Sequence, residues 1–423
     1  LPLMALDEAI AHGRQALADG AAGDDRLAVG RVLVRTLELR GLDEEADVLA
    51  QDLLRVTSGS AAARVEARIA VAGFFARRDR AAQALELVEG LPSALPDEQR
   101  ESMALVRSNA MRDLGRIEES RQVILAALER HPAMDARRVE LLDCWTITEN
   151  AAGRHDEALR AAQQSLDLSR RLADARGEAM ALKRMSVMLM HGGQPAEAET
   201  QLKAAAAAFE RLGMVGQQRG ALFNLCVLHA SQTRPEQVLR AAQMAWDLKP
   251  PQDLHPLRVH LQLAFVEAHI GLGQLGPAWH WLQGAVRDAQ ALGSLDVTTA
   301  TLITGAELMV LLDRRQDIDD LLTRIDPAAL SELQLMASEF WVTMTEWALV
   351  AGDLEAARRS WQYTLPAEQV PIEYVRARHA VVLAAMHLAE DRAADSLQAL
   401  PAPDQSGLSN ELRWRALAVR LAA

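Results

Sequence analysis

Cysteine is almost missing from this chain: among 423 residues there are two, Cys144 and Cys226. Two cysteines supply neither a disulfide framework nor a complete metal site, so we expect a reducing compartment, the cytoplasm. Gly and Pro are also scarce, with 24 and 15 residues, which argues against a loop-rich β protein and against a disordered chain. Aromatic residues make up only 4%, whereas 50% of the residues are apolar, and Ala and Leu dominate. Because Ala and Leu favour helices, the composition predicts an all-α protein.

A net positive charge and long hydrophobic runs are missing as well. The net charge is −13, and there are only three lysines, Lys183, Lys203 and Lys249. Nucleic-acid binding depends on neutralising phosphates with Lys and Arg, so we expect no nucleic-acid partner for this chain alone. No apolar run approaches the roughly 20 residues that span a bilayer, and no signal peptide is recognisable, so we expect no membrane contact.

The motifs of common catalytic and metal sites are missing too. The eleven histidines include no His-Glu-x-x-His pair, and the chain has neither a phosphate-binding Gly-Lys-Ser/Thr loop nor a Gly-x-Ser-x-Gly elbow. Cys226 and several histidines fall at positions that recur along the chain as packing positions. The chain is therefore predicted not to be an enzyme and to need neither a cofactor nor a metal.

One short pattern recurs about every forty residues: a small or polar turn, an acidic residue or Pro, then Ala at the start of an amphipathic helix. Clear copies are Gly41–Ala46, Gly153–Ala158 and Gly193–Ala198. The successive turn positions are 41, 77, 115, 153, 193, 233, 273, 313, 352 and 391, with spacings of 36 to 40 residues. Such regular turns are typical of stacked helical hairpins, each with a helix A before the turn and a helix B after it.

Three positions around each turn carry side chains of one size class. Seven residues before the turn and five after it, they are mostly small, such as Cys226, Val266 and Ala278, which lets helices A and B approach closely. Eight residues before the turn they are mostly bulky, such as Trp145 and Phe265, which fills the layer between helices. The pattern therefore predicts which residues form the core of each hairpin.

Over residues 26–400 the chain resembles the tetratricopeptide repeat (TPR) superfamily. The resemblance lies in the order of a bulky residue, a small residue, a turn glycine and an Ala five residues after the turn. The period near 40 and the segment Leu172–Gly177 are similar to the long repeats of bacterial signal-transduction ATPases and transcriptional regulators. The resemblance implies an all-α, right-handed superhelical solenoid of about ten antiparallel helix hairpins, whose helices A line a concave groove. We expect one continuous domain over 1–423, with a partial repeat at 1–25, about ten repeats at 26–400 and a capping helix at 401–423.

The resemblance also implies which residues line the groove, namely those 13, 10, 6 and 3 before each turn. Most are apolar, and Glu267, Glu307 and Glu346 occupy one equivalent position in three successive repeats. The partner expected from this strip is a protein or peptide with apolar and basic groups. The alternative is that curvature buries the strip while its glutamates pair with nearby arginines. The candidate groove residues are Met180, Lys183, Val187, Met190, Phe223, Val227, His260, Leu263, Glu267, Ile270, Ile303, Glu307, Val310, Glu339, Val342 and Glu346.

Three functions remain open from the sequence. The favoured one is a non-catalytic protein- or peptide-binding domain that acts as the sensor or interaction segment of a larger bacterial regulator. The chain begins Leu-Pro-Leu inside half a repeat, so we expect a piece of a longer protein whose other domains are further candidate partners. The alternatives are a stand-alone scaffold that assembles a protein complex, and a sensor of a small-molecule effector.

Overall fold

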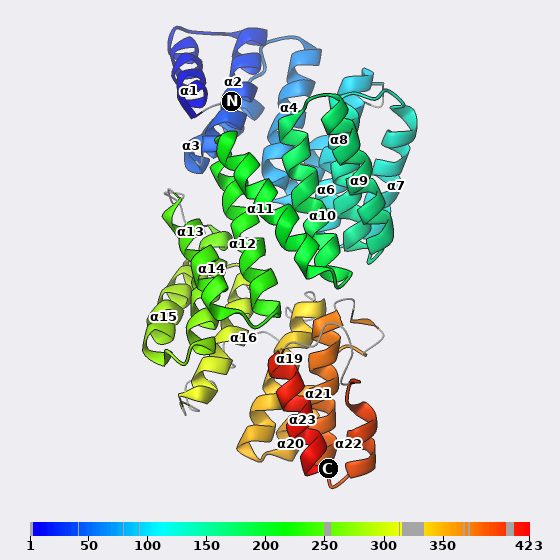
Figure 1. The fold of residues 1–423 in the computed structure, drawn as a ribbon. Coiled ribbons are helices and arrows are strands. Elements are labelled where there is room, and N and C mark those ends of the chain that lie inside the picture. Colours follow the sequence, from blue (N-terminus) through cyan, green and yellow to red (C-terminus); the bar gives the residue numbers. More distant parts are fainter. Residues whose placement is uncertain are drawn as a thin grey trace. The chain divides into compact units, whose positions relative to one another are not determined.

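A computed structural model describes residues 3–40, 42–78, 80–92, 94–248, 255–312, 314, 334–366, 369–370, 373–402 and 410–423. These residues form twenty-one α-helices and no strand (Figure 1), so the all-α prediction is confirmed. The chain divides into two compact units, each described by itself. Unit 1 is mainly Leu1–Gly192 and Ala196–Ala221, and unit 2 is mainly Leu222–Lys249 and Leu254–Ala423. Among the described helices, none has the length and hydrophobicity that a membrane span requires.

The helices follow one another as antiparallel pairs, for example α8 with α9 and α14 with α15 (Figure 1). Unit 1 contains α1 (Leu3–Ala18), α2 (Gly23–Arg40), α3 (Asp43–Arg55), α4 (Ala61–Ala76), α5 (Ala81–Glu89), α6 (Asp97–Asp113), α7 (Ile117–Arg130), α8 (Ala136–Ala151), α9 (His155–Arg171), α10 (Ala175–His191) and α11 (Pro195–Arg211). Helix α12 (Val215–Ser231) contributes residues to both units. Unit 2 contains α13 (Pro235–Asp247), α14 (Pro256–Gly271), α15 (Leu275–Leu292), α16 (Leu295–Leu311), α19 (Gln334–Ala351), α20 (Leu354–Trp361), α21 (Glu373–Ala389), α22 (Ala393–Ala399) and α23 (Asn410–Ala422).

Most described turns lie where the sequence pattern places them, and those at positions 115, 153, 233, 273, 352 and 391 share one hydrogen-bond arrangement. Gly153 has φ +72°; its N–H donates to the carbonyl of Asn150 (3.0 Å), and the Arg154 N–H donates to that of Glu149 (2.9 Å). This pair of bonds is a Schellman motif, which satisfies the last carbonyls of helix A and requires a left-handed residue. Thr233 and Asp391 adopt the same conformation with φ +55° and +58°. Positions 41 and 313 lie outside the described residues.

Thr233 is expected to strain its turn, because a β-branched residue at positive φ costs about 1–2 kcal/mol. The exchange Thr233→Gly removes this strain but also makes the unfolded chain more flexible, which offsets part of the gain. We expect a net stabilisation of roughly 0.5–1 kcal/mol in thermal unfolding of unit 2. At the next turn, the exchange Gly273→Ala places a Cβ on a residue with φ +68°. The Cβ would meet no atom within 4 Å, so the expected destabilisation of unit 2 comes from the backbone conformation. Equal melting temperatures for all three chains would contradict this account.

The predicted packing positions form the core in most repeats. Cys226, Val266 and Ala278 are fully buried, and the Cys226 thiol donates to the carbonyl of Leu222 (3.3 Å). Burial raises the pKa of Cys226 to about 12, so this thiol is a packing group that stays protonated. The repeat that turns at Arg77 departs from the pattern. Arg77 has φ −85°, and Ala81 is buried in place of Ala82, which is exposed.

The segment Leu172–Gly177 ends in glycine because another side chain would not fit. The Asp174 carboxylate caps helix α10 by accepting from the N–H groups of Arg176 (3.1 Å) and Gly177 (3.0 Å). A Cβ on Gly177 would lie 2.5 Å from Ser169 Oγ and 2.9 Å from Val139 Cγ1. The cap and the close contact with the preceding repeat together account for the aspartate and the glycine of this segment.

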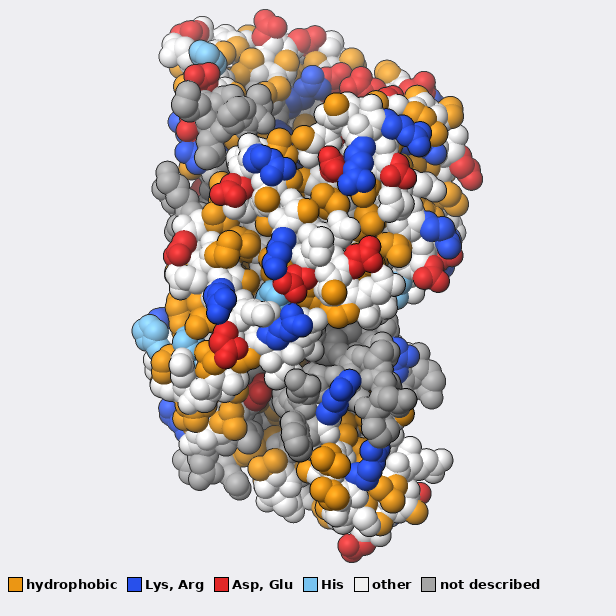
Figure 2. Space-filling model, in the orientation of Figure 1, with side chains coloured by type: hydrophobic (Ala, Val, Ile, Leu, Met, Phe, Trp, Pro, Cys, Tyr) orange, Lys and Arg blue, Asp and Glu red, His pale blue; other side chains and the backbone are white. Residues whose placement is uncertain are grey.

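Charged side chains of both signs are interspersed over the face drawn in Figure 2. Many form ion pairs within one helix, such as Lys203–Glu199 (2.6 Å) and Arg160–Glu157 (2.8 Å). Exposed pairs of this kind contribute about 0–1 kcal/mol each. The stability of the hairpins therefore depends mainly on the buried apolar layers between the helices.

Candidate functional site

The sequence-predicted groove residues fall in both units. Met180, Lys183, Val187 and Met190 lie on α10 in unit 1, and all have half-buried side chains. The other twelve lie on α12, α14, α16 and α19 in unit 2. The structure therefore presents two separate sets, and each is described within its own unit.

Two residues assigned to the groove are buried in the core. Leu263 is 4% exposed and Val342 is 0% exposed, so neither can contact a partner, and we leave both out of the candidate site. Leu263 belongs to a cluster of buried side chains with Leu302 and Phe340, because the neighbouring helices cover this side of α14. The side chain of Val310 lies outside the described part of the structure.

Lys183 is the cation of the unit 1 set. Its Nζ donates to Oε1 of Gln217 (3.1 Å), and the neighbouring Arg184 is paired with Asp143 (3.0 Å). Burial, together with the positive charge of Arg184, lowers the pKa of Lys183 to about 8. The ammonium group therefore loses its charge at a lower pH than an ordinary lysine side chain does.

Glutamates dominate the unit 2 set. We call the surface formed by Phe223, Val227, His260, Glu267, Ile270, Ile303, Glu307, Glu339 and Glu346 the glutamate face; its members come from α12, α14, α16 and α19. Glu267 and Glu307 are open to solvent, whereas Glu339 and Glu346 are half-buried. The rings of Phe223 and His260 pack with centroids 5.7 Å apart. Val227, on the same helix as Phe223, has a side chain that is 36% exposed. The face therefore combines accessible apolar groups with carboxylates.

Three of these carboxylates are close enough to disturb one another. The pKa of Glu267 is raised to about 7 by the surrounding protein, and further by the charges of Glu307 and Glu339, while a hydrogen bond with Thr304 opposes the shift. Burial also raises the pKa of Glu339. One side of Glu267 is open to solvent although protein surrounds the rest of it. The structure thus brings together carboxylates that repel one another at neutral pH.

Glu346 is different because arginines neutralise it. Arg378 on α21 donates through Nη2 to Oε2 of Glu346 (2.6 Å) and to Oγ1 of Thr343 (3.0 Å). Arg415 on α23 pairs with the other carboxylate oxygen. The two guanidinium groups lower the pKa of Glu346, although its partial burial acts in the opposite direction. The alternative reading of the glutamate strip, local pairing with arginines, therefore applies to Glu346.

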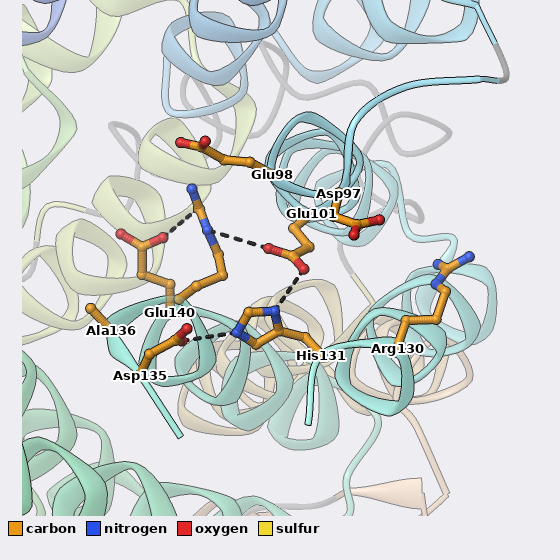
Figure 3. A pocket seen from close by; sticks show the side chains of 9 residues that line it. Asp97, Glu98, Glu101, Arg130, His131, Asp135, Ala136 and Glu140 are labelled. Atoms are coloured by element: carbon orange, nitrogen blue, oxygen red, sulfur yellow. Dashed lines mark hydrogen bonds and ion pairs between the residues drawn. The ribbon is translucent and has the colours of Figure 1, made fainter. Parts of the chain in front are cut away.

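A polar cleft in unit 1 was not anticipated from the sequence (Figure 3). It has a volume of about 500 Å³ and lies between the starts of α6 and α8 and the end of α7. At its centre His131 Nδ1 lies 2.7 Å from Glu101 Oε1, and Nε2 lies 2.8 Å from Asp135 Oδ1. Arg137 bridges Glu101 (3.7 Å) and Glu140 (2.6 Å) on the same wall. The one sequence signal was the spacing of His131 and Asp135, which are four residues apart.

His131 is expected to make unit 1 less stable as the pH rises. A neutral imidazole has one N–H, so donation to both carboxylates requires the protonated ring. Hydrogen bonds to Asp135 and Glu101 raise the pKa of His131 above its ordinary 6.5. The stabilisation is therefore fully present below pH 6.5 and is lost as the pH rises through the higher folded-state pKa. The other charged residues that line this cleft are Asp97, Glu98, Arg130, Arg137 and Glu140.

The measurement is the melting temperature of unit 1 between about pH 6 and pH 9. The variant His131→Gln is expected to flatten this dependence, whereas His280→Gln, which changes an exposed histidine on α15, should leave it as in the parent chain. Parallel pH profiles for the parent chain and His131→Gln would rule out the bridging imidazolium. Neither this cleft nor any other group of His, Cys, Asp and Glu among the described residues has the arrangement of a metal site.

Comparison with known proteins identifies the fold. No protein-family model and no curated protein matches the sequence. The apo form of the quorum sensor NprR from B. thuringiensis is 12% identical, and the match covers 80% of this chain and 96% of that one with a TM-score of 0.56. The apo form of RapI is 8% identical over 80% of this chain and 96% of that one, with a TM-score of 0.50. The chain therefore has a TPR-like helical repeat fold, as the repeat pattern predicts.

Proposed function

We propose that this chain is a non-catalytic repeat domain that binds a protein or peptide through the glutamate face of unit 2. The partner carries apolar groups for Phe223, Val227 and Ile303, and basic groups for the glutamates. We further propose that the chain is the sensor or interaction segment of a larger cytoplasmic bacterial regulator, whose other domains are candidate partners. The observation that carries the proposal is an accessible face that combines apolar side chains with the carboxylates of Glu267, Glu307, Glu339 and Glu346.

Two further points support binding over a purely structural role. The fold is similar to that of a quorum sensor, a protein that responds to a ligand. In addition, burial together with the charges of Glu307 and Glu339 raises the pKa of Glu267 to about 7, so the charged form of Glu267 is unfavourable in the folded chain at neutral pH, and a basic partner favours that form. A face that only packed against its own chain would gain nothing from such an arrangement.

The test is selection of binders from a displayed library of random 12-residue peptides against the full chain, followed by measurement of Kd. We expect enriched peptides with apolar and basic residues. The variant Val227→Arg places a cation on the glutamate face and is expected to weaken binding about tenfold or more. Met244→Arg makes the same exchange at an exposed residue on α13 and serves as the control. The proposal fails when no peptide is enriched, or when both variants bind the selected peptides like the parent chain.

A further inference from the structure

Lys183 in unit 1 is held by a neutral group and not by an acid. Its side chain is half-buried on α10, and Nζ donates to the amide Oε1 of Gln217 on α12 (3.1 Å). The carboxylate of Asp143 on α8 accepts from Arg184 instead (3.0 Å). In the part of the chain that the structure describes, no carboxylate lies within ion-pair distance of Lys183. A half-buried ammonium group therefore lies next to a second positive charge, with one amide oxygen as its acceptor.

Lys203 provides the contrast within the same unit. It is exposed on α11, and its ammonium group pairs with Glu199 one turn earlier (2.6 Å). Lys249 lies outside the described residues. Burial and a neighbouring cation both favour the neutral amine over the ammonium ion, and together they lower the pKa of Lys183 to about 8. At neutral pH a larger fraction of Lys183 than of an ordinary lysine therefore carries a free electron pair.

The surroundings of Nζ leave space for a small molecule with an apolar part. Gly220 on α12 faces the amine, since a Cβ at this position would lie 3.0 Å from Nζ. Met180 and Val187 lie three residues before and four residues after Lys183, so they share one face of α10 with it, and both are half-buried. All of these residues belong to unit 1. The site thus combines an amine, an acceptor that orients it and two apolar side chains on the same helix face.

We propose that Lys183 is a covalent binding site for a small apolar aldehyde, which it holds reversibly as an imine. Desolvation and a neighbouring cation are the conditions that make a lysine amine a nucleophile toward carbonyl groups, and Lys183 meets both. Lys183 belongs to unit 1, so this site does not depend on the function proposed for the glutamate face of unit 2.

The reaction needs only the amine and the aldehyde. The electron pair of Nζ attacks the carbonyl carbon, a C–N bond forms, and a proton passes from the nitrogen to the carbonyl oxygen. Loss of that oxygen as water then leaves the C=N bond, and addition of water reverses both steps. One amine and one aldehyde give one imine and one water, so no oxidant or reductant takes part. Gln217 accepts one N–H of the neutral amine and so orients its electron pair.

The experiment uses the full chain with butanal as the probe and cyanoborohydride as the trap, which reduces the imine to a stable secondary amine. Peptide mapping by mass spectrometry gives the rate of labelling at each lysine. At pH 7 we expect Lys183 to react at least about tenfold faster than Lys203, because a lysine with the ordinary pKa near 10.4 has roughly a hundredfold less free amine. The rate at Lys183 should also level off as butanal is increased, since all of Lys183 is then present as the imine.

The variant Arg184→Gln tests the neighbouring charge. The exchange removes the cation and frees Asp143 to pair with Lys183. Both effects favour the ammonium form, so labelling at Lys183 should slow at least about threefold. Arg160→Gln changes an exposed arginine on α9 and serves as the matched control, for which we expect the rate of the parent chain.

The variant Gly220→Val tests the space beside the amine. The added side chain covers Nζ, so labelling at Lys183 should slow about tenfold, while Lys203 reacts as in the parent chain. Circular dichroism spectra equal to that of the parent chain show that the variants are folded. The covalent site is overturned when Lys183 reacts no faster than Lys203, when its rate does not level off with butanal, or when Arg184→Gln and Gly220→Val both react like the parent chain.

Discussion

Replacing Phe265 by alanine is expected to lower the melting temperature of unit 2 by roughly 10 °C. Phe265 is 1% exposed and lies on α14 between two tryptophans. Its ring stacks on Trp281 with centroids 4.2 Å apart and meets Trp246 edge-on at 6.0 Å. Loss of a buried Phe costs about 3–5 kcal/mol, since the cavity is only partly refilled and the aromatic contacts vanish.

Two variants make this prediction specific. Phe265→Leu keeps most of the volume and loses only the ring contacts, so about half of the effect should remain. Met244→Ala removes an exposed side chain from neighbouring α13 and should change the stability of unit 2 by less than about 0.5 kcal/mol. Differential scanning calorimetry measures all three chains. A shift for Phe265→Ala no larger than that for Met244→Ala would show that Phe265 does not belong to the core as described.

The location of Phe265 could be predicted because the repeat carries the information locally. Burial at each position depends on its distance from the turn, and the turn itself is marked by one left-handed residue. The same rule places Cys226 and Ala278 in the core. It fails around Arg77, where the residue at the expected turn position has φ −85° and the next helix begins in a different register, so that Ala81 is buried in place of Ala82. A register rule holds only as long as the geometry of the turn is repeated.

The boundary of the groove was harder to predict than the core. The residue ten positions before each turn lies at the edge of helix A. The size of the neighbouring side chains decides whether this residue is covered. Ile303 and Phe223 remain half-buried at this position, whereas Leu263 and Val342 are covered. The hydrophobic period alone does not distinguish these outcomes, since it describes one helix and not the crossing of two.

Partners far apart in the sequence could not be predicted at all. The spacing of Glu267, Glu307 and Glu346 indicates an acidic row, yet the arginine that pairs with Glu346 from α23 lies 69 residues away. The cleft around His131 depends likewise on Glu101, 30 residues earlier. In both places the pattern shows which side chains are charged, and only the packed helices decide which charges meet. The pairing of Glu346 with two arginines therefore came from the structure.

Glu149 gives the second large effect: the exchange Glu149→Ala is expected to destabilise unit 1 by roughly 2–3 kcal/mol. Glu149 on α8 is 0% exposed, and its Oε1 lies 2.5 Å from Nε of Arg121 on α7. At several other turns, the residue four positions before the turn is apolar and buried, as Leu37 and Met309 are. Removal of the carboxylate leaves the Arg121 charge without its closest partner. Because Arg121 is itself 24% exposed, water compensates part of this loss, so we expect less than the full 3–5 kcal/mol of a buried pair.

Replacing both partners tests the origin of this effect. In the double variant Arg121→Met/Glu149→Met no charge remains buried, and an apolar pair of similar volume takes its place, so stability should return close to that of the parent chain. Glu157→Ala breaks an exposed pair with Arg160 on α9 and should cost less than about 0.5 kcal/mol. Urea unfolding of unit 1 measures the four chains. A double variant as unstable as Glu149→Ala would mean that the ion pair itself, and not the charge left behind after its removal, stabilises the hairpin.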